Sequence, residues 1–141
     1  MSHTNPSDDT LRTILTDATT IAIVGASANP EKPSHGIMKR LLGAGYRVIP
    51  VNPNEPEVLG QKAYKALRDI PDKVDIVDVF RRGEDTPPIA DDAVAIGAKV
   101  LWLQLGVAND DAAARAEAGG LTVVMNACIG ATHVALGIPH K

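Results

Sequence analysis

Hydrophobic residues in this chain gather in short runs, and apolar residues recur at helical spacing between the runs. The runs are rich in β-branched residues and lie at 21–24, 46–51, 74–79, 99–103 and 121–125. Because they are continuous rather than alternating, they predict strands that are buried on both faces, as in a parallel sheet. The spacing between and before them predicts helices at 8–17, 34–43, 62–68, 84–97 and 108–118.

The alternation of strands and helices predicts right-handed crossovers and an open, doubly wound parallel sheet of about five strands. We therefore expect an α/β, Rossmann-like fold with a single domain over residues 8–141, preceded by a flexible tail at residues 1–7. Sheets of this kind bind ligands outside the carboxyl ends of their strands, near the point where the strand order reverses. The loops that follow the predicted strands are therefore where functional residues are expected.

Composition narrows the class of protein. A length of 141 residues suits one domain, and with 45% hydrophobic but only 3% aromatic residues the core must be mainly aliphatic. A net charge of −3 gives no basic surface for nucleic acid, and no apolar run approaches the roughly 20 residues of a membrane span. The polar N-terminus is typical of neither a signal nor a transit peptide, and the lone Cys128 suits a reducing compartment. A cytoplasmic protein without nucleic-acid or membrane partners is expected.

The loop after the first strand carries the features of an anion site. Gly25, Ala26 and Ser27 are small enough for the backbone to approach a ligand closely. Ser34 is expected to cap the next helix, whose N-terminal amides attract anions, and Lys32 adds a positive charge beside them. This pattern indicates phosphate or pyrophosphate binding. The alternative is a tight turn that needs glycine and serine for its shape alone.

The loop after the second strand begins with Asn52 and Pro53, and the nearest acid is Glu55. An NAD site usually places an acidic residue directly after this strand, where it binds the adenosine ribose. The missing carboxylate therefore favours a ligand with phosphate on that ribose, and the proline offers a flat apolar edge to an adenine ring. A proline-rich turn without a binding role is the alternative.

Polar and cationic residues follow the third and fourth strands. Phe80 stands before Arg81 and Arg82, and a guanidinium group pairs well with phosphate. Gln104 is a polar residue inside an apolar run, which is costly if it is buried without a partner. Gly106 permits a ligand to approach the backbone closely. We therefore expect one of the arginines to contact a polyanionic ligand; the alternatives are that Phe80 is only a core residue and that one arginine is only solvated.

The loop after the fifth strand holds Asn126, Cys128 and, further on, His133. We count Asn126 among the expected cofactor-binding residues. Cys128 and His133 have no third orienting group, and the cysteine and histidines of the chain do not show the spacing of metal ligands. We therefore expect no catalytic residues and no metal site.

Five sequence blocks occur together in this order: VGASxxPxKPS (24–34), GYxVxPVNP (45–53), VDxVDVFRR (74–82), GAKxLWLQLGV (97–107) and GxxVVMxxC (120–128). Taken together they resemble the small stand-alone CoA-binding proteins, whose fold is similar to the CoA-binding domain of succinyl-CoA synthetase α subunits. The resemblance spans about Ile21 to His133, most of the chain.

The resemblance implies a Rossmann fold that takes coenzyme A across the carboxyl edge of the sheet. It places the adenosine beside Asn52 and Pro53. By the same resemblance the phosphates would be surrounded by Gly25, Ala26, Ser27, Lys32 and Ser34, and the remaining cleft would be lined by Phe80, Arg81, Gln104 and Gly106. We expect a protein that binds CoA or acyl-CoA without catalysis of its own, and the same edge could serve an unknown protein partner. The alternatives are a small NAD(P)-dependent oxidoreductase and a redox regulator in which Cys128 forms a mixed disulfide with CoA.

Overall fold

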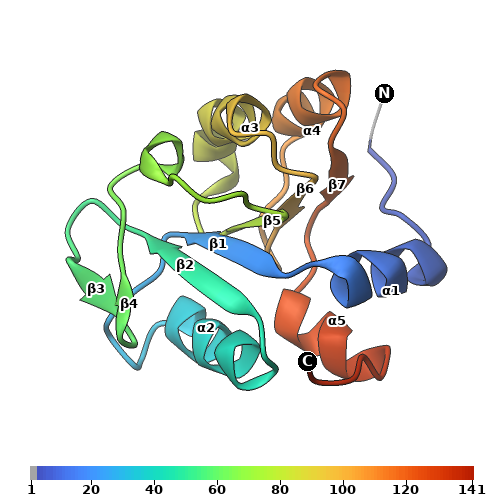
Figure 1. Ribbon diagram of the computed structural model, residues 1–141. Coiled ribbons are helices and arrows are strands. Elements are labelled where there is room, and N and C mark those ends of the chain that lie inside the picture. Colours follow the sequence, from blue (N-terminus) through green and yellow to red (C-terminus); the bar gives the residue numbers. More distant parts are fainter. Residues whose placement is uncertain (1–2) are drawn as a thin grey trace.

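The computed structural model describes residues 3–141, and its centre is a five-stranded parallel sheet (Figure 1). The strands are β1 (Thr20–Val24), β2 (Arg47–Val51), β5 (Ile76–Val79), β6 (Val100–Leu103) and β7 (Thr122–Val124). Their order across the sheet is β2-β1-β5-β6-β7, and every neighbouring pair is parallel. The chain first winds from β1 outward to β2 and then returns to β5 on the other side, so the strand order reverses between β1 and β5.

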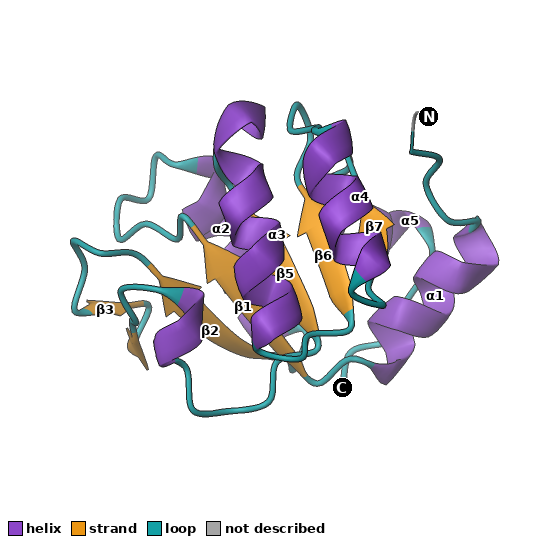
Figure 2. Ribbon diagram, turned by 90° about the horizontal axis from the view of Figure 1, so that it is seen from above, coloured by secondary structure: helices purple, strands orange, loops and turns teal. Residues whose placement is uncertain are grey.

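Helices cover both faces of the sheet (Figure 2). They are α1 (Asp8–Asp17), α2 (Pro33–Gly43), α3 (Thr86–Ala95), α4 (Asp110–Ala118) and α5 (Ile129–Ala135). Alanines of α3 and α4 pack on one face of the sheet, and larger apolar residues of α1, α2 and α5 pack on the other. The predicted α/β Rossmann-like fold with a doubly wound parallel sheet is confirmed.

The continuous apolar runs are buried on both faces, as their pattern predicts. Successive residues of β6 point to opposite sides, so that Leu101 contributes to the core under α3 and α4 while Trp102 contributes to the core under α1, α2 and α5. Trp102 is fully buried, and its indole Nε1 donates a hydrogen bond to the carbonyl oxygen of Ala127 at 2.9 Å. The tryptophan therefore serves sheet packing and does not face a ligand.

The helix predicted at 62–68 is wrong. Residues 57–62 instead form a short antiparallel pair of strands, β3 (Glu57–Val58) and β4 (Gln61–Lys62). The 3₁₀ turn η1 (Leu67–Asp69) follows them. Two consecutive residues with positive φ, at 59 and 60, make the turn between β3 and β4. A bridge between Val51 and Tyr64 then holds the segment along the outer edge of β2, so edge pairing outweighs local helical spacing.

One further helix prediction needs correction, and one helix was missed. The helix predicted at 84–97 is divided into the 3₁₀ turn η2 (Gly83–Asp85) and α3. Helix α5 was not predicted at all. It packs closely on α2, since a Cβ atom at Gly130 would lie 2.9 Å from the Cδ1 atom of Ile37. A glycine in a helix is unfavourable by propensity, so packing on α2 stabilises α5 where the local sequence does not.

The N-terminal segment contacts the residue that follows the last strand of the sheet. The Asn5 carboxamide donates to the carbonyl oxygen of Met125 and accepts from its amide, both at 2.8 Å. Residues 1 and 2 of the predicted tail lie outside the described residues, and the flexibility of residues 1–7 stays a prediction. Among the helices of residues 3–141, none has the length and apolar character that crossing a membrane requires.

Candidate functional site

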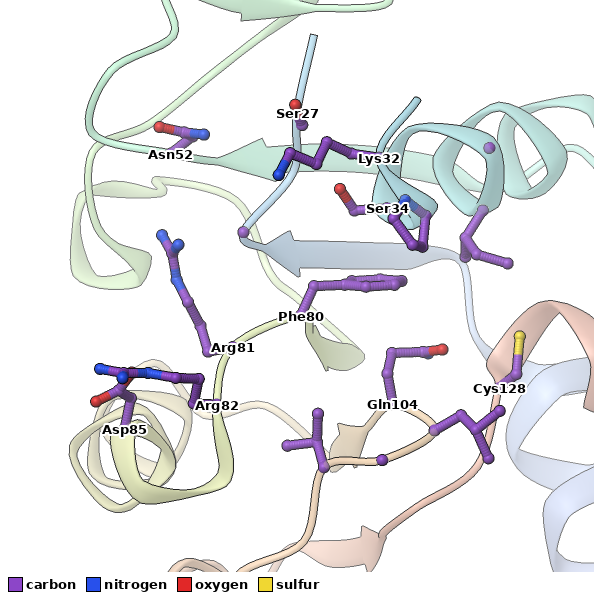
Figure 3. A pocket seen from close by; sticks show the side chains of 17 residues that line it. Ser27, Lys32, Ser34, Asn52, Phe80, Arg81, Arg82, Asp85, Gln104 and Cys128 are labelled. Atoms are coloured by element: carbon purple, nitrogen blue, oxygen red, sulfur yellow. The ribbon is translucent and has the colours of Figure 1, made fainter. Parts of the chain in front are cut away.

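A cavity of about 1040 Å³ lies at the carboxyl edge of the sheet, beside the point where the strand order reverses (Figure 3). Its walls come from the loops after β1, β2, β5 and β6, from the first turns of α2, and from Cys128 just before α5. This is the position at which doubly wound sheets bind their ligands. The cavity is therefore the candidate functional site.

Most of the residues predicted to bind the cofactor meet in this cavity. Nine of the twelve line it: Gly25, Ser27, Lys32, Ser34, Asn52, Phe80, Arg81, Gln104 and Gly106. The other three do not. Ala26 is fully buried in the core, while Pro53 and Asn126 are exposed outside the cavity lining.

The close turn after β1 requires glycine. Gly25 has a φ of +92°, and a Cβ atom there would lie 2.4 Å from the carbonyl oxygen of Phe80. Its amide donates to the carbonyl oxygen of Val51 at 3.0 Å. The end of β1 is thus packed directly between the ends of β2 and β5, and this fixes the floor of the cavity.

The long loop between β1 and α2 is a series of small turns held by its own polar groups. The Ser27 hydroxyl accepts the amide of Asn29, and the Asn29 carboxamide oxygen accepts the amide of Glu31, both at 3.0 Å. The amide of Lys32 then donates to the Asn29 carbonyl oxygen at 3.0 Å. These contacts set Lys32 at the rim of the cavity, directly before α2.

The predicted N-cap role of Ser34 is wrong. Helix α2 begins one residue earlier, at Pro33, because proline has the backbone φ of a first helical residue and needs no amide partner there. Lys32 occupies the cap position, and its ammonium group cannot accept a hydrogen bond from the amides of the helix. Ser34 is buried inside the first turn. The N-terminus of α2 therefore faces the cavity without a side-chain cap, which favours an anion.

Two asparagines connect neighbouring strand ends. The Asn52 side chain donates to the carbonyl oxygen of Ala26 at 2.7 Å and accepts the amide of Asn54 at 2.8 Å. The Asn126 carboxamide oxygen accepts the amide of Gly106 at 2.8 Å, and Asn126 itself has a φ of +54°. Both side chains hold loops together, so the structure gives Asn52 and Asn126 a positioning role.

The cavity contains cations that are available to a ligand. Among residues 3–141, no carboxylate forms an ion pair with Lys32 or Arg81, whereas Arg82 pairs with Glu84 at 3.0 Å and with Asp85 at 3.2 Å. Figure 3 shows the Lys32 and Arg81 side chains directed into the same opening. Of the two adjacent arginines, Arg81 is therefore the one free to bind an anion.

The remaining wall is largely apolar. In Figure 3, Gln104 and Cys128 lie on the side of the cavity away from the cations, and Phe80 lies between the two groups. Leu105, which also lines the cavity, is 71% exposed. Sequence reasoning did not select Leu105, because an exposed leucine cannot be told from a core leucine by composition alone. The two regions together suit a ligand with an anionic part and an uncharged part.

A buried pair of polar side chains lies beneath this wall. Gln104 is only 4% exposed, and its Nε2 atom donates a hydrogen bond to the Oδ1 atom of Asp78, which is fully buried in β5. Burial raises the pKa of Asp78 to about 8, against the smaller lowering effect of the Gln104 hydrogen bond. Asp78 is thus largely uncharged at neutral pH. Sequence reasoning missed this residue, although an acid inside the apolar run of 74–79 was the available signal.

Cys128 and His133 do not form a pair. Cys128 is half-buried and lines the cavity, whereas His133 belongs to the buried face of α5, with its ring centroid 5.8 Å from that of Tyr46. Burial, followed by the nearby cations and His140, lowers the pKa of His133. His133 therefore belongs to the packing of the C-terminal helix and does not act on the cavity.

Comparison with known proteins identifies the family. Residues 19–134 match the model of a family described as CoA binding domain. The chain belongs to this family. The resemblance to CoA-binding proteins that the sequence blocks indicate is therefore confirmed, and the CoA-binding domain accounts for the whole sheet and the cavity at its edge.

Relatives of this CoA-binding domain include both small proteins and long ligases. The uncharacterized protein YneT of Bacillus subtilis is 41% identical, and the alignment covers 92% of this chain and 96% of YneT. The solved structure of a hypothetical protein from Pyrococcus horikoshii is 42% identical with a TM-score of 0.90, covering 96% of this chain and 99% of that one. The α subunit of ADP-forming acetate–CoA ligase I of Pyrococcus furiosus is 36% identical over 87 residues, which are 57% of this chain but only 19% of the ligase subunit.

Proposed function

We propose that this protein binds coenzyme A, free or acylated, in the cavity between the ends of β1 and β5. The observation that carries the proposal is a pair of cations, Lys32 and Arg81, which have no ion-pair partner within residues 3–141 and lie beside the uncapped N-terminus of α2. Phosphate groups are stabilised by backbone amides at a helix N-terminus and by guanidinium or ammonium groups. Membership of the CoA-binding domain family supports the same ligand.

The arrangement of the cavity suggests how the cofactor is oriented. Its phosphates would lie among Ser27, Lys32 and Arg81, and its adenosine would lie toward the loop after β2. The uncharged arm would then run along Phe80 and Gln104 toward Cys128. This order matches the separation of the cationic and apolar regions of the cavity.

We expect binding without catalysis. In the cavity of the described chain, Cys128 has no histidine beside it among the lining residues. Asp85, the acid among the lining residues of the described chain, pairs with Arg82, and the buried Asp78 contacts Gln104. A nucleophile needs a base within hydrogen-bond reach, and this arrangement lacks that pairing. A role as a carrier, a sensor or a subunit that docks to another protein fits these features.

Isothermal titration of the full chain with CoA at pH 7 tests the proposal. We expect saturable heat that weakens by about tenfold or more in the double variant Lys32→Ala/Arg81→Ala, since hydrogen bonds to charged groups contribute about 1.5–3 kcal/mol. The double variant Arg12→Ala/Lys39→Ala is the matched control, because it removes the same charge from residues outside the cavity lining. No heat and no thermal shift at millimolar CoA would reject the proposal. A preference for NADH in a competition assay would replace it with the oxidoreductase alternative.

The position of Cys128 on the cavity wall supports a second candidate function in redox regulation. The Cys128 thiolate would attack a CoA disulfide, forming a protein–CoA mixed disulfide and releasing the other CoA as a thiolate. Intact-mass measurement after incubation with CoA disulfide should show an adduct that is absent from Cys128→Ala. An unchanged mass in the wild-type protein would reject this second function.

A further inference from the structure

Asp78 is the one carboxyl side chain that is fully buried among residues 3–141. Its neighbours across the sheet are Ile23 in β1 and Trp102 in β6. A buried carboxyl group costs stability, and an apolar residue of similar size would fit this position at less cost. Within the described chain, the one hydrogen bond of the Asp78 side chain is that from Gln104, and its Oδ2 atom has no partner. The Asp78 carboxyl group therefore contributes little to the stability of the fold. Its hydrogen bond from Gln104 is the contact that points to another role.

Gln104 presents one end of its carboxamide to the protein and the other to the cavity. Its Nε2 atom donates to Asp78. Its Oε1 atom accepts no hydrogen bond from residues 3–141, and it is not one of the buried side-chain atoms without a partner in that range. This oxygen is therefore open to the cavity that Gln104 lines. Figure 3 shows this oxygen on the side toward Cys128, away from Lys32 and Arg81.

A carboxamide can rotate by half a turn and exchange its donor and its acceptor, so a specific partner is needed to fix its direction. The Oδ1 atom of Asp78 is that partner, and because Oδ1 accepts from Nε2, a proton on the carboxyl group lies on Oδ2. While Oδ1 accepts from Nε2, the carbonyl oxygen of Gln104 must face outward. An apolar residue at position 78 would leave the buried Nε2 atom without an acceptor, so the carboxamide would no longer be held in this place.

We propose that Asp78 is a positioning residue that turns the Gln104 carbonyl oxygen into the cavity, where it accepts a hydrogen bond from an amide N–H of the ligand's uncharged arm. This inference rests on the proposed function, since the arm of coenzyme A carries amide groups. Gln104 lies on the side away from the cations, so its contact serves the arm and not the phosphates. The pair would thereby select a ligand with an amide-bearing arm over a bare nucleotide.

The test measures the affinity of two ligands, CoA and adenosine 3′,5′-bisphosphate, which lacks the arm. Asp78→Leu removes the acceptor, Gln104→Met removes the carboxamide, and Asp78→Asn keeps an acceptor in the same place. We expect Asp78→Leu and Gln104→Met to weaken CoA binding by about five- to thirtyfold, the loss that one buried hydrogen bond produces. Both variants should bind the bisphosphate within about twofold of wild type, and Asp78→Asn should bind CoA within about threefold.

Binding of the bisphosphate also shows that each variant is folded. The inference is overturned if Asp78→Leu binds CoA as tightly as wild type, if it weakens both ligands equally, or if Asp78→Asn loses as much CoA affinity as Asp78→Leu. Failure of the proposed function is a separate result, in which the wild-type protein itself binds neither ligand.

Discussion

Replacing Asp78 with asparagine should change how the stability of the protein depends on pH. The substitution keeps the size of the side chain and an acceptor for Gln104, but removes the ionisable group. Burial raises the pKa of Asp78 from 3.8 to about 8 in the folded protein. The folded state therefore holds this proton more tightly than the unfolded state, and the free energy of unfolding falls as the pH rises between these two values.

The size of the effect follows from the two pKa values. Each tenfold change in proton affinity corresponds to about 1.4 kcal/mol. The difference between a pKa of 3.8 and one of about 8 therefore lowers the free energy of unfolding by about 6 kcal/mol as the pH rises from the first value to the second. Between pH 5 and pH 7 the wild-type protein should lose about 3 kcal/mol relative to Asp78→Asn. Above about pH 8 the difference between the two proteins should stay constant.

Urea unfolding at pH 5, 6 and 7, followed by circular dichroism, measures this difference. Asp75→Asn is the matched control in the same segment. Burial raises the pKa of Asp75, but the amides of Thr20 and Thr19 donate to its carboxylate and the net pKa is lowered. Wild type should therefore lose stability relative to Asp75→Asn only as the pH falls into the acid range. Parallel stability curves for wild type and Asp78→Asn from pH 5 to pH 7 would refute the reasoning about Asp78.

Further predictions concern the cavity and its floor. Arg81→Ala should weaken CoA binding about tenfold in isothermal titration. Arg82→Ala should change it less than threefold, because the Arg82 side chain already pairs with carboxylates, and equal losses would contradict the choice of Arg81 as the phosphate-binding arginine. Saturating CoA should slow alkylation of Cys128 by iodoacetamide, measured by mass spectrometry, while adenosine 3′,5′-bisphosphate should protect it little; equal protection would place the arm elsewhere. Gly25→Ala should lower the free energy of unfolding by about 2–4 kcal/mol in urea, because of its positive φ and the nearby carbonyl oxygen, and an unchanged value would contradict this geometry.

The sheet could be predicted from the sequence because its signal is local. Five continuous apolar runs separated by helical patterns leave few arrangements other than a parallel sheet covered on both faces. The segment 62–68 was misassigned because its structure depends on pairing with the edge of β2, which local spacing does not contain. Helix α5 was missed for a similar reason, since its contact with α2 forms only once the chain is folded.

The candidate site could likewise be predicted only in part. The residues after each strand could be selected because a parallel sheet brings its carboxyl ends to one edge, and nine of those selected line one cavity. The roles of Asn52 and Asn126 could not be predicted, because their partners are backbone atoms of neighbouring loops. The pairing of Asp78 with Gln104 likewise depends on the register between β5 and β6, which places residues 26 positions apart in contact.

A crystal structure of the protein soaked with coenzyme A tests the central claim most directly. We expect the phosphates within hydrogen-bond distance of Lys32 and Arg81 at the carboxyl edge, with the arm passing Gln104 toward Cys128. A cofactor bound in the smaller cavity of about 220 Å³ that includes Asp75 and Lys99, with the first cavity empty, would contradict the account.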